Sequence, residues 1–287
     1  MTDRGGVEIF EVGPRDGLQN ERRPIPAEEK IALVDLLSQA GFRRIEVASF
    51  VSPRWVPQMA GSAEVMAGIE RARGVSYAAL TPNLRGYEAA RDAEADEVAI
   101  FASASEGFSR ANLNATIDES LERFAPVAEA ARRDGMPVRG YVSCVTDCPF
   151  DGLVPPEDVA RVVAALRRLG CYEVSLGDTI GRGRPEAVDA MLGAVLGEMD
   201  PDRLAGHFHD TAGRALENVD VALGRGLRVF DAAVGGLGGC PYAPGAAGNV
   251  ATEALMAHLE AQGHETGLDG AVVRQAAEMA RSMRSGD

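Results

Sequence analysis

Lysine is almost absent from this 287-residue chain, which has Lys30 alone and carries the rest of its positive charge on arginine. The 29 basic and 43 acidic residues give a net charge of −14, which argues against a nucleic acid or an anionic membrane surface as partner. A few local arginines can still bind one phosphorylated ligand, so the net charge does not exclude a small substrate that carries phosphate.

Long apolar runs are also missing. No run reaches the length needed to span a membrane, and no charged-then-apolar leader opens the chain. There are four cysteines, and the C-x3-C pair of Cys144 and Cys148 does not have the zinc-type C-x2-C spacing. We therefore expect free thiols in a reducing compartment, the cytoplasm, and no membrane association.

What the chain has instead is a regular alternation of short apolar runs and helical patterns, typical of a parallel sheet buried on both faces. The predicted strands are 7–12, 44–49, 75–80, 97–102, 138–144, 172–176, 204–209 and 229–233. Eight such units predict an α/β fold, a (β/α)8 TIM barrel formed by residues 1–287 as a single catalytic domain. A further helix at about 269–282 follows it. The competing open, doubly wound sheet usually has a Gly-rich phosphate loop after its first strand, and none is present here.

His207 and His209 are the first two candidate metal ligands. Side chains alternate along a strand, so two imidazoles two residues apart point the same way and form half of a metal site. Asp16 follows the first predicted strand, and Asn249 lies in the loop after the eighth. Both supply oxygen ligands, with Glu46 in support. This mixed set suits octahedral Mg²⁺ or Mn²⁺ better than tetrahedral zinc.

Polar residues recur where the predicted strands end, the place where barrel enzymes gather their active sites. They include Arg15, Asp16, Glu46, Ser49, Arg139, Tyr141, Asp178, Thr179, His207, His209, Cys240 and Asn249. Among these we expect substrate contacts from Arg15, Ser49, Arg139, Tyr141 and Thr179.

Several stretches resemble the 3-hydroxy-3-methylglutaryl-CoA lyase family of metal-dependent barrels. They are residues 11–21, 49–59, 138–144, 175–181, 207–211 and 235–242, and the similarity covers roughly 7–282. The Arg15-Asp16 pair and the His-x-His motif alone also fit Claisen-type synthases and oxo-acid aldolases. The Ser-Phe-Val-Ser-Pro run and the Gly-Gly-Cys-Pro-Tyr loop are specific to the lyases.

The resemblance implies cleavage of a carbon–carbon bond in 3-hydroxy-3-methylglutaryl-CoA, giving acetyl-CoA and acetoacetate with a divalent metal. It implies that the metal ligands are Asp16, His207, His209 and Asn249, and that the residues of catalysis are Arg15, Asp16, Glu46, Tyr141, Asp178 and Cys240. In the mechanism that we expect, Asp16 accepts the hydroxyl proton and Cys240 returns a proton to the leaving carbon. The resemblance also suggests leucine degradation, and we expect a homodimer or other homo-oligomer.

Two departures from the family bear on the acyl group. Ala212 and Arg214 stand where the family has Tyr and Gln, and Thr146-Asp147 replaces a more apolar pair. Loss of the Tyr is expected to enlarge the pocket near the metal. Three alternatives therefore stay open: a lyase for a longer or differently branched 3-hydroxy-3-alkylglutaryl-CoA, a Claisen-type acyl-CoA synthase, and a non-catalytic CoA- or metal-binding protein.

Overall fold

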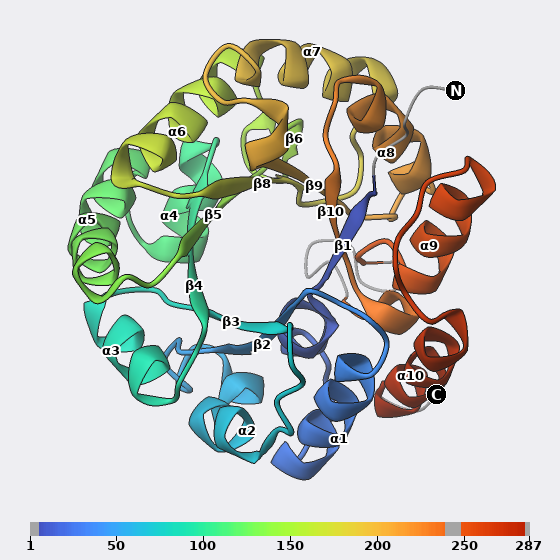
Figure 1. The fold of residues 1–287 in the computed structure, drawn as a ribbon. Coiled ribbons are helices and arrows are strands. Elements are labelled where there is room, and N and C mark those ends of the chain that lie inside the picture. Colours follow the sequence, from blue (N-terminus) through green and yellow to red (C-terminus); the bar gives the residue numbers. More distant parts are fainter. Residues whose placement is uncertain (1–5, 239–247, 285–287) are drawn as a thin grey trace.

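The computed structural model describes residues 6–238 and 248–284. Eight parallel strands close into a barrel in the order β1-β10-β9-β8-β5-β4-β3-β2, seen along its axis in Figure 1. They are β1 (Glu8–Glu11), β2 (Arg44–Ser49), β3 (Ser76–Leu80), β4 (Glu97–Ser103), β5 (Val138–Ser143), β8 (Glu173–Asp178), β9 (Leu204–Phe208) and β10 (Val229–Ala232). The predicted (β/α)8 barrel is confirmed.

Helices surround the barrel (Figure 1), because each presents an apolar face to the outside of the strands. They are α1 (Ala27–Ser38), α2 (Ser62–Gly68), α3 (Leu84–Asp92), α4 (Glu106–Leu113), α5 (Ile117–Asp134), α6 (Pro156–Leu169), α7 (Pro185–Val195), α8 (Ala215–Gly224), α9 (Thr252–Ala261) and α10 (Gly270–Met283). The predicted extra helix at 269–282 is α10, which packs against α1 and α9.

Helix α4 and one short hairpin were not predicted. Helix α4 has eight residues and begins where the Ser105 hydroxyl accepts a hydrogen bond from the amide of Phe108. The hairpin of β6 (Asp147–Cys148) and β7 (Gly152–Leu153) has two residues in each strand. Strands of two residues carry too little periodicity to be recognised in a sequence.

The inside of the barrel holds charged side chains as well as apolar ones. Two guanidinium groups contact the ring of Phe10 on β1, with the Cζ atoms of Arg139 and Arg44 at 4.4 and 4.8 Å from its centroid. Glu173 on β8 accepts hydrogen bonds from both arginines. This buried charged layer lies beneath the carboxyl ends of the strands.

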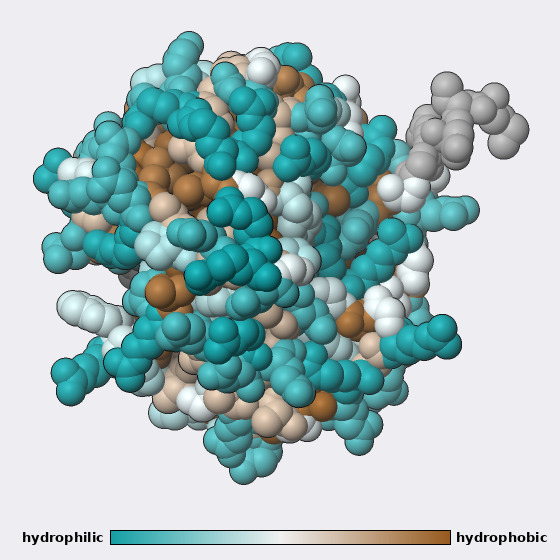
Figure 2. All heavy atoms as spheres, turned by 60° about the vertical axis from the view of Figure 1, so that its left-hand side comes forward, coloured by the Kyte–Doolittle hydropathy of each residue, from teal (hydrophilic) through white to brown (hydrophobic). Residues whose placement is uncertain are grey.

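The outer surface is mostly hydrophilic on the face drawn in Figure 2, where apolar side chains appear in small groups. In the part of the chain that the structure describes, no helix is both long and apolar enough to cross a membrane.

Candidate active site

A cavity of about 670 Å³ opens where the barrel strands end. Six of the residues predicted for the site line it: Arg15, Asp16, Tyr141, Thr179, His207 and His209. Apolar side chains complete the wall, with Leu80 on β3 and Phe101 on β4 among them. Since β3 and β9 occupy opposite sides of the ring, Leu80 faces the histidine-bearing strand across the mouth.

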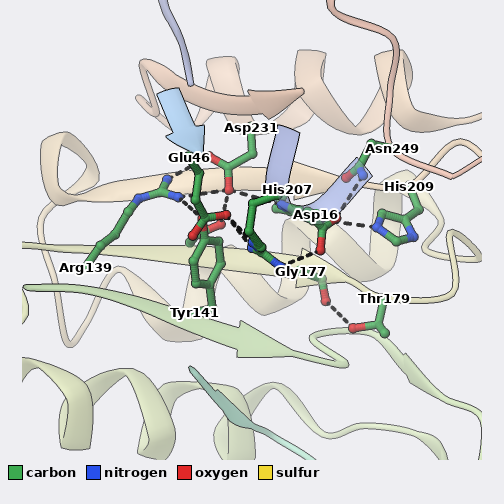
Figure 3. A network of polar contacts seen from close by, with 12 residues as sticks. Asp16, Glu46, Arg139, Tyr141, Gly177, Thr179, His207, His209, Asp231 and Asn249 are labelled. Atoms are coloured by element: carbon green, nitrogen blue, oxygen red, sulfur yellow. Dashed lines mark hydrogen bonds and ion pairs between the residues drawn. The ribbon is translucent and has the colours of Figure 1, made fainter. Parts of the chain in front are cut away.

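Asp16, His207 and His209 form one cluster, shown in Figure 3. One ligand atom from each lies within 4.8 Å of the others. The two Nε2 atoms are 3.3 Å apart, and Nε2 of His207 is 3.9 Å from the Asp16 carboxylate. The structure therefore brings together three of the four predicted metal ligands around one small space.

The loop after β1 places Asp16. It forms a single π-helical turn, η1 (Gly13–Gly17), in which the amides of Asp16 and Gly17 both donate to the carbonyl of Val12. A side chain at Gly17 would put its Cβ 2.6 Å from that of Leu237. Only glycine lets this turn pack against the loop after β10.

Glu11, at the end of β1, holds the turn that carries Asp16 against the loop after β10. Its buried carboxylate accepts hydrogen bonds from the amides of Gly13 and Val234 and from the hydroxyl of Thr252. These partners belong to the Asp16 turn, the loop after β10 and the start of α9. Glu11 opens one of the stretches that resemble the lyase family, but no role was predicted for it.

A pH-dependent stability follows from this burial. Burial raises the pKa of Glu11 to about 7, and the hydrogen bonds from Thr252, Val234 and Gly13 only partly oppose it. Because the folded pKa lies above the unfolded one, Glu11 contributes stability that is complete below about pH 4.5 and is lost as the pH rises through 7.

In Glu11→Gln, the amide oxygen accepts the two N–H bonds and the NH2 donates to Thr252, so the variant mimics the protonated acid. Relative to wild type, its free energy of unfolding should rise by about 2 kcal/mol between pH 5.5 and 8.5. Urea titrations at both pH values measure this difference, and parallel pH curves would contradict the assignment.

The two imidazoles differ in their surroundings. Burial lowers the pKa of His207, but the hydrogen bond and charge of Asp231 outweigh it and hold the pKa above its usual value. Burial and the neighbouring His207 lower the pKa of His209 to about 4. His209 is therefore neutral at physiological pH, with a lone pair available for a cation.

Arg15 joins two carboxylates beside this cluster. Its NH1 donates to Asp16 at 2.7 Å, and its Nε donates to Glu46 at 2.5 Å. Burial would raise the pKa of Asp16, but the charge of Arg15 and the two histidines lower it to about 2. Burial raises the pKa of Glu46, whose Oε1 has no hydrogen-bond partner among the described residues.

Asn249 reaches the cluster through its amide nitrogen. Nδ2 donates to Oδ2 of Asp16 at 2.8 Å and to the carbonyl of Leu237 at 3.2 Å. A nitrogen donor is not a metal ligand, so the predicted coordination would use Oδ1, the other arm of the same amide. The observed hydrogen bond gives Asn249 one role, which is to orient the Asp16 carboxylate.

Besides Glu46 and Asn249, three further described residues predicted for the site do not line the cavity. Arg139 is buried beneath it, with its guanidinium bonded to Glu173, Tyr141 and Asp231, so it is not available to a substrate. Ser49 is fully buried, and its hydroxyl has no partner within the described ranges.

The third is Asp178, which is also fully buried. Its carboxylate accepts hydrogen bonds from the amides of Arg182 and Gly183 and from the hydroxyl of Thr146. It therefore orders the loop after β8 and does not face the cavity.

Cys240 lies outside the described residues. Cys144, Cys148 and Cys171 are buried free thiols, as predicted for these three. Ala212 is exposed in a turn before α8, and its short side chain does not line the cavity. Asn112, Asn114 and Arg123 also line the cavity.

Asp231 was missed from the sequence, although its carboxylate holds His207. The available signal was a single acid inside the otherwise apolar strand at 229–233.

These residues fit a divalent cation. Two neutral-capable imidazoles and an ionised carboxylate converge, and Nδ1 of His207 is occupied by Asp231, which leaves its Nε2 for a ligand bond. Oxygen and nitrogen donors without thiolate are the set expected for Mg²⁺, Mn²⁺ or a similar ion.

Comparison with known proteins agrees with this geometry. The family model described as HMGL-like matches residues 6–280. A Pseudomonas aeruginosa protein named 3-hydroxy-3-isohexenylglutaryl-CoA/hydroxy-methylglutaryl-CoA lyase is 59% identical over 92% of this chain and 88% of its own. The structure of an HMG-CoA lyase from Brucella melitensis is 60% identical, with a TM-score of 0.97 and coverage of 98% of this chain and 99% of that one. An HMG-CoA lyase from Acinetobacter baumannii, solved with coenzyme A and 3-methylmalate, is 36% identical, with a TM-score of 0.92 and coverage of 100% and 98%.

Proposed function

The chain belongs to the HMGL-like family, and from this premise we propose that it is a carbon–carbon lyase that cleaves 3-hydroxy-3-methylglutaryl-CoA to acetyl-CoA and acetoacetate. The observation that carries the proposal is the convergence of Asp16, His207 and His209 beside Arg15 at the mouth of the cavity. The coenzyme A complex of the Acinetobacter relative supports an acyl-CoA as substrate.

Asp16, His207 and His209, with Oδ1 of Asn249, would hold the divalent cation. When bound, such an ion polarises the 3-hydroxyl of the substrate, lowers the pKa of that hydroxyl and orients the bond to be cleaved.

Arg15 carries the other half of the chemistry. As the bond breaks, negative charge develops on the thioester oxygen of the departing enolate. A guanidinium already fixed between Asp16 and Glu46 needs no reorganisation to face this charge, and such preorganised donors are typically worth about 3–4 kcal/mol. In this proposal Asp16, which lines the cavity, accepts the proton of the 3-hydroxyl.

Glu46 is proposed to position Arg15 and not to touch the substrate. In Glu46→Gln, the amide oxygen keeps one bond to Arg15, but the opposing charge is lost. We expect kcat to fall about 10²-fold through misplacement of the guanidinium. KM and the affinity for Mn²⁺ should change little, because Glu46 lies behind Arg15. Steady-state kinetics beside a Mn²⁺ titration test this, and near-native kcat would remove Glu46 from the mechanism.

Cys240 is proposed as the acid that protonates the leaving carbon, on the resemblance of its loop alone. A thiol has a suitable pKa range for this transfer. Cys240→Ala should lower kcat about 10²–10⁴-fold while leaving Mn²⁺ binding intact. The buried Cys171→Ala serves as the matched control, and near-native turnover by Cys240→Ala would exclude the role.

A second substrate is favoured by the apolar wall that faces the histidines. A cavity of about 670 Å³ lined by Leu80 and Phe101 offers space for a larger 3-alkyl branch, and the Pseudomonas aeruginosa relative is named for both substrates. We propose 3-hydroxy-3-isohexenylglutaryl-CoA as the alternative.

The deciding experiment measures kcat/KM for both thioesters with Mg²⁺ and with Mn²⁺, before and after EDTA treatment. Cleavage of 3-hydroxy-3-methylglutaryl-CoA that is lost in EDTA and restored by either ion supports the proposal. Thiol release from acetyl-CoA with oxo acids would instead indicate a Claisen-type synthase.

The remaining predictions concern the setting of the enzyme. We propose Mg²⁺ or Mn²⁺ as the ion, residues 1–287 as one catalytic domain, and a homodimer or other homo-oligomer in solution. Light scattering of the purified protein tests the last of these. A cytoplasmic location and a part in leucine degradation stay predictions.

A further inference from the structure

The far side of His207 is held by a residue that the proposed reaction does not use. Its Nδ1 lies 3.0 Å from Oδ2 of Asp231, on the neighbouring strand β10. Asp231 is 1% exposed, so water does not compete for this contact. A carboxylate accepts hydrogen bonds and does not donate them, which makes Nδ1 of His207 the protonated nitrogen.

Asp231 is itself fixed by three other donors (Figure 3). NH2 of Arg139 donates to Oδ1 at 2.7 Å, and NH1 donates to Oδ2 at 3.0 Å. The hydroxyl of Ser175 donates to Oδ2 at 2.7 Å. A planar guanidinium binding both oxygens sets the plane of the carboxylate, and with it the direction in which Oδ2 meets the imidazole.

Arg139 is anchored in turn from deeper in the barrel. Its Nε donates to Glu173 at 2.7 Å, and Glu173 also accepts a hydrogen bond from Arg44. This series of alternating charges ends at Glu8, the first residue of β1, which accepts a hydrogen bond from Arg44. The position of Asp231 is therefore set by the rigid barrel and not by a loop.

We propose that Asp231, held by Arg139, is the positioning residue that fixes the tautomer and orientation of His207, so that its Nε2 is presented to the cation. This inference rests on the proposed cation site. Outer partners of metal-ligating histidines usually matter by about 10–100-fold in metal affinity or activity. The buried Arg139–Asp231 pair also has a structural role, so the test needs a readout that packing alone would not move.

The first measurement uses the unaltered protein. The chain has four histidines, so ¹⁵N-labelled imidazoles give four ring systems, and His207→Asn identifies the one that disappears. In metal-free protein at alkaline pH, where the rings are neutral, we expect His207 to carry its proton on Nδ1. A proton on Nε2, or an equal mixture of tautomers, would overturn the proposal without any variant having to fold.

The second measurement is the Mn²⁺ affinity of Asp231→Asn, by calorimetry and by electron paramagnetic resonance in the absence of substrate. We expect a dissociation constant about 10–100-fold weaker than that of wild type, and a tautomer of His207 that is no longer uniform. Asp220→Asn is the matched control, because this carboxylate also contacts a histidine ring, that of His258, but on the outside of the barrel. Its affinity should stay within a few-fold of wild type.

The outcomes separate this inference from the proposed function. If wild type binds no Mn²⁺, the proposed cation site fails. If wild type binds Mn²⁺ and Asp231→Asn binds it equally well with an unchanged tautomer, the positioning role alone is overturned.

Discussion

Replacement of Arg15 with lysine is expected to lower kcat about 10³-fold. The ammonium group keeps the positive charge between Asp16 and Glu46, so the two buried carboxylates remain compensated and the fold is retained. It does not keep the planar fork that reaches both carboxylates while facing the cavity. Loss of the fork therefore affects the developing enolate charge more than it affects substrate binding.

The measurement is steady-state turnover of 3-hydroxy-3-methylglutaryl-CoA at saturating Mn²⁺, with thermal unfolding recorded on the same samples. Arg22→Lys, at an exposed position seven residues along the chain, is the control and should behave as wild type. A loss of less than about tenfold for Arg15→Lys, with an unchanged melting temperature, would contradict the role given to the guanidinium.

The second large effect is expected from His209→Asn. The asparagine amide is shorter than the imidazole, so one of the two converging Nε2 donors is lost from the cluster. The loss should exceed the roughly 10–100-fold cost of removing an outer partner, because a direct ligand is removed. We expect Mn²⁺ affinity to fall more than about 100-fold and turnover at micromolar Mn²⁺ to disappear.

His258→Asn is the control for this variant. His258 lies on α9, where it contacts Asp220 on the outside of the barrel, away from the cavity. High Mn²⁺ should partly restore turnover in His209→Asn, since the other ligands remain. Wild-type affinity in His209→Asn would mean that this imidazole does not hold the ion.

The fold was predictable because its strands and helices carry strong local signals. The sequence predicts a helix over 156–169 that ends before Gly170, and α6 has these bounds. Proline favours the first turn, and Gly170, with a φ of 99°, terminates the helix. The sequence also predicts a helix over 212–225, but α8 begins at Ala215. The side chain of Asp210 accepts a hydrogen bond from the amide of Ala215 and holds the intervening residues in a turn.

The convergence of Asp16, His207 and His209 was also predictable, since the carboxyl ends of barrel strands meet at one mouth. The depth of each side chain within the barrel was not predictable. Arg139 and Tyr141 are two residues apart on β5 and share its inner face, yet Tyr141 lines the cavity and Arg139 lies one layer lower. Alternation along a strand predicts the face of a side chain but not the layer in which it ends.

The charges below the cavity escaped prediction for the same reason. Asp231 and Glu173 read in the sequence as isolated acids in apolar strands, and only the closed barrel brings both to Arg139. The role of Glu11 likewise depends on hydrogen bonds from residues more than 200 positions away in the sequence.

The most direct test of a single cation held by residues from three separate segments is a crystal grown with Mn²⁺ and measured at a wavelength where manganese scatters anomalously. We predict one anomalous peak in direct contact with the Asp16 carboxylate and with Nε2 of both His207 and His209. No peak at that position, in an enzyme that still turns over its thioester in EDTA, would contradict it.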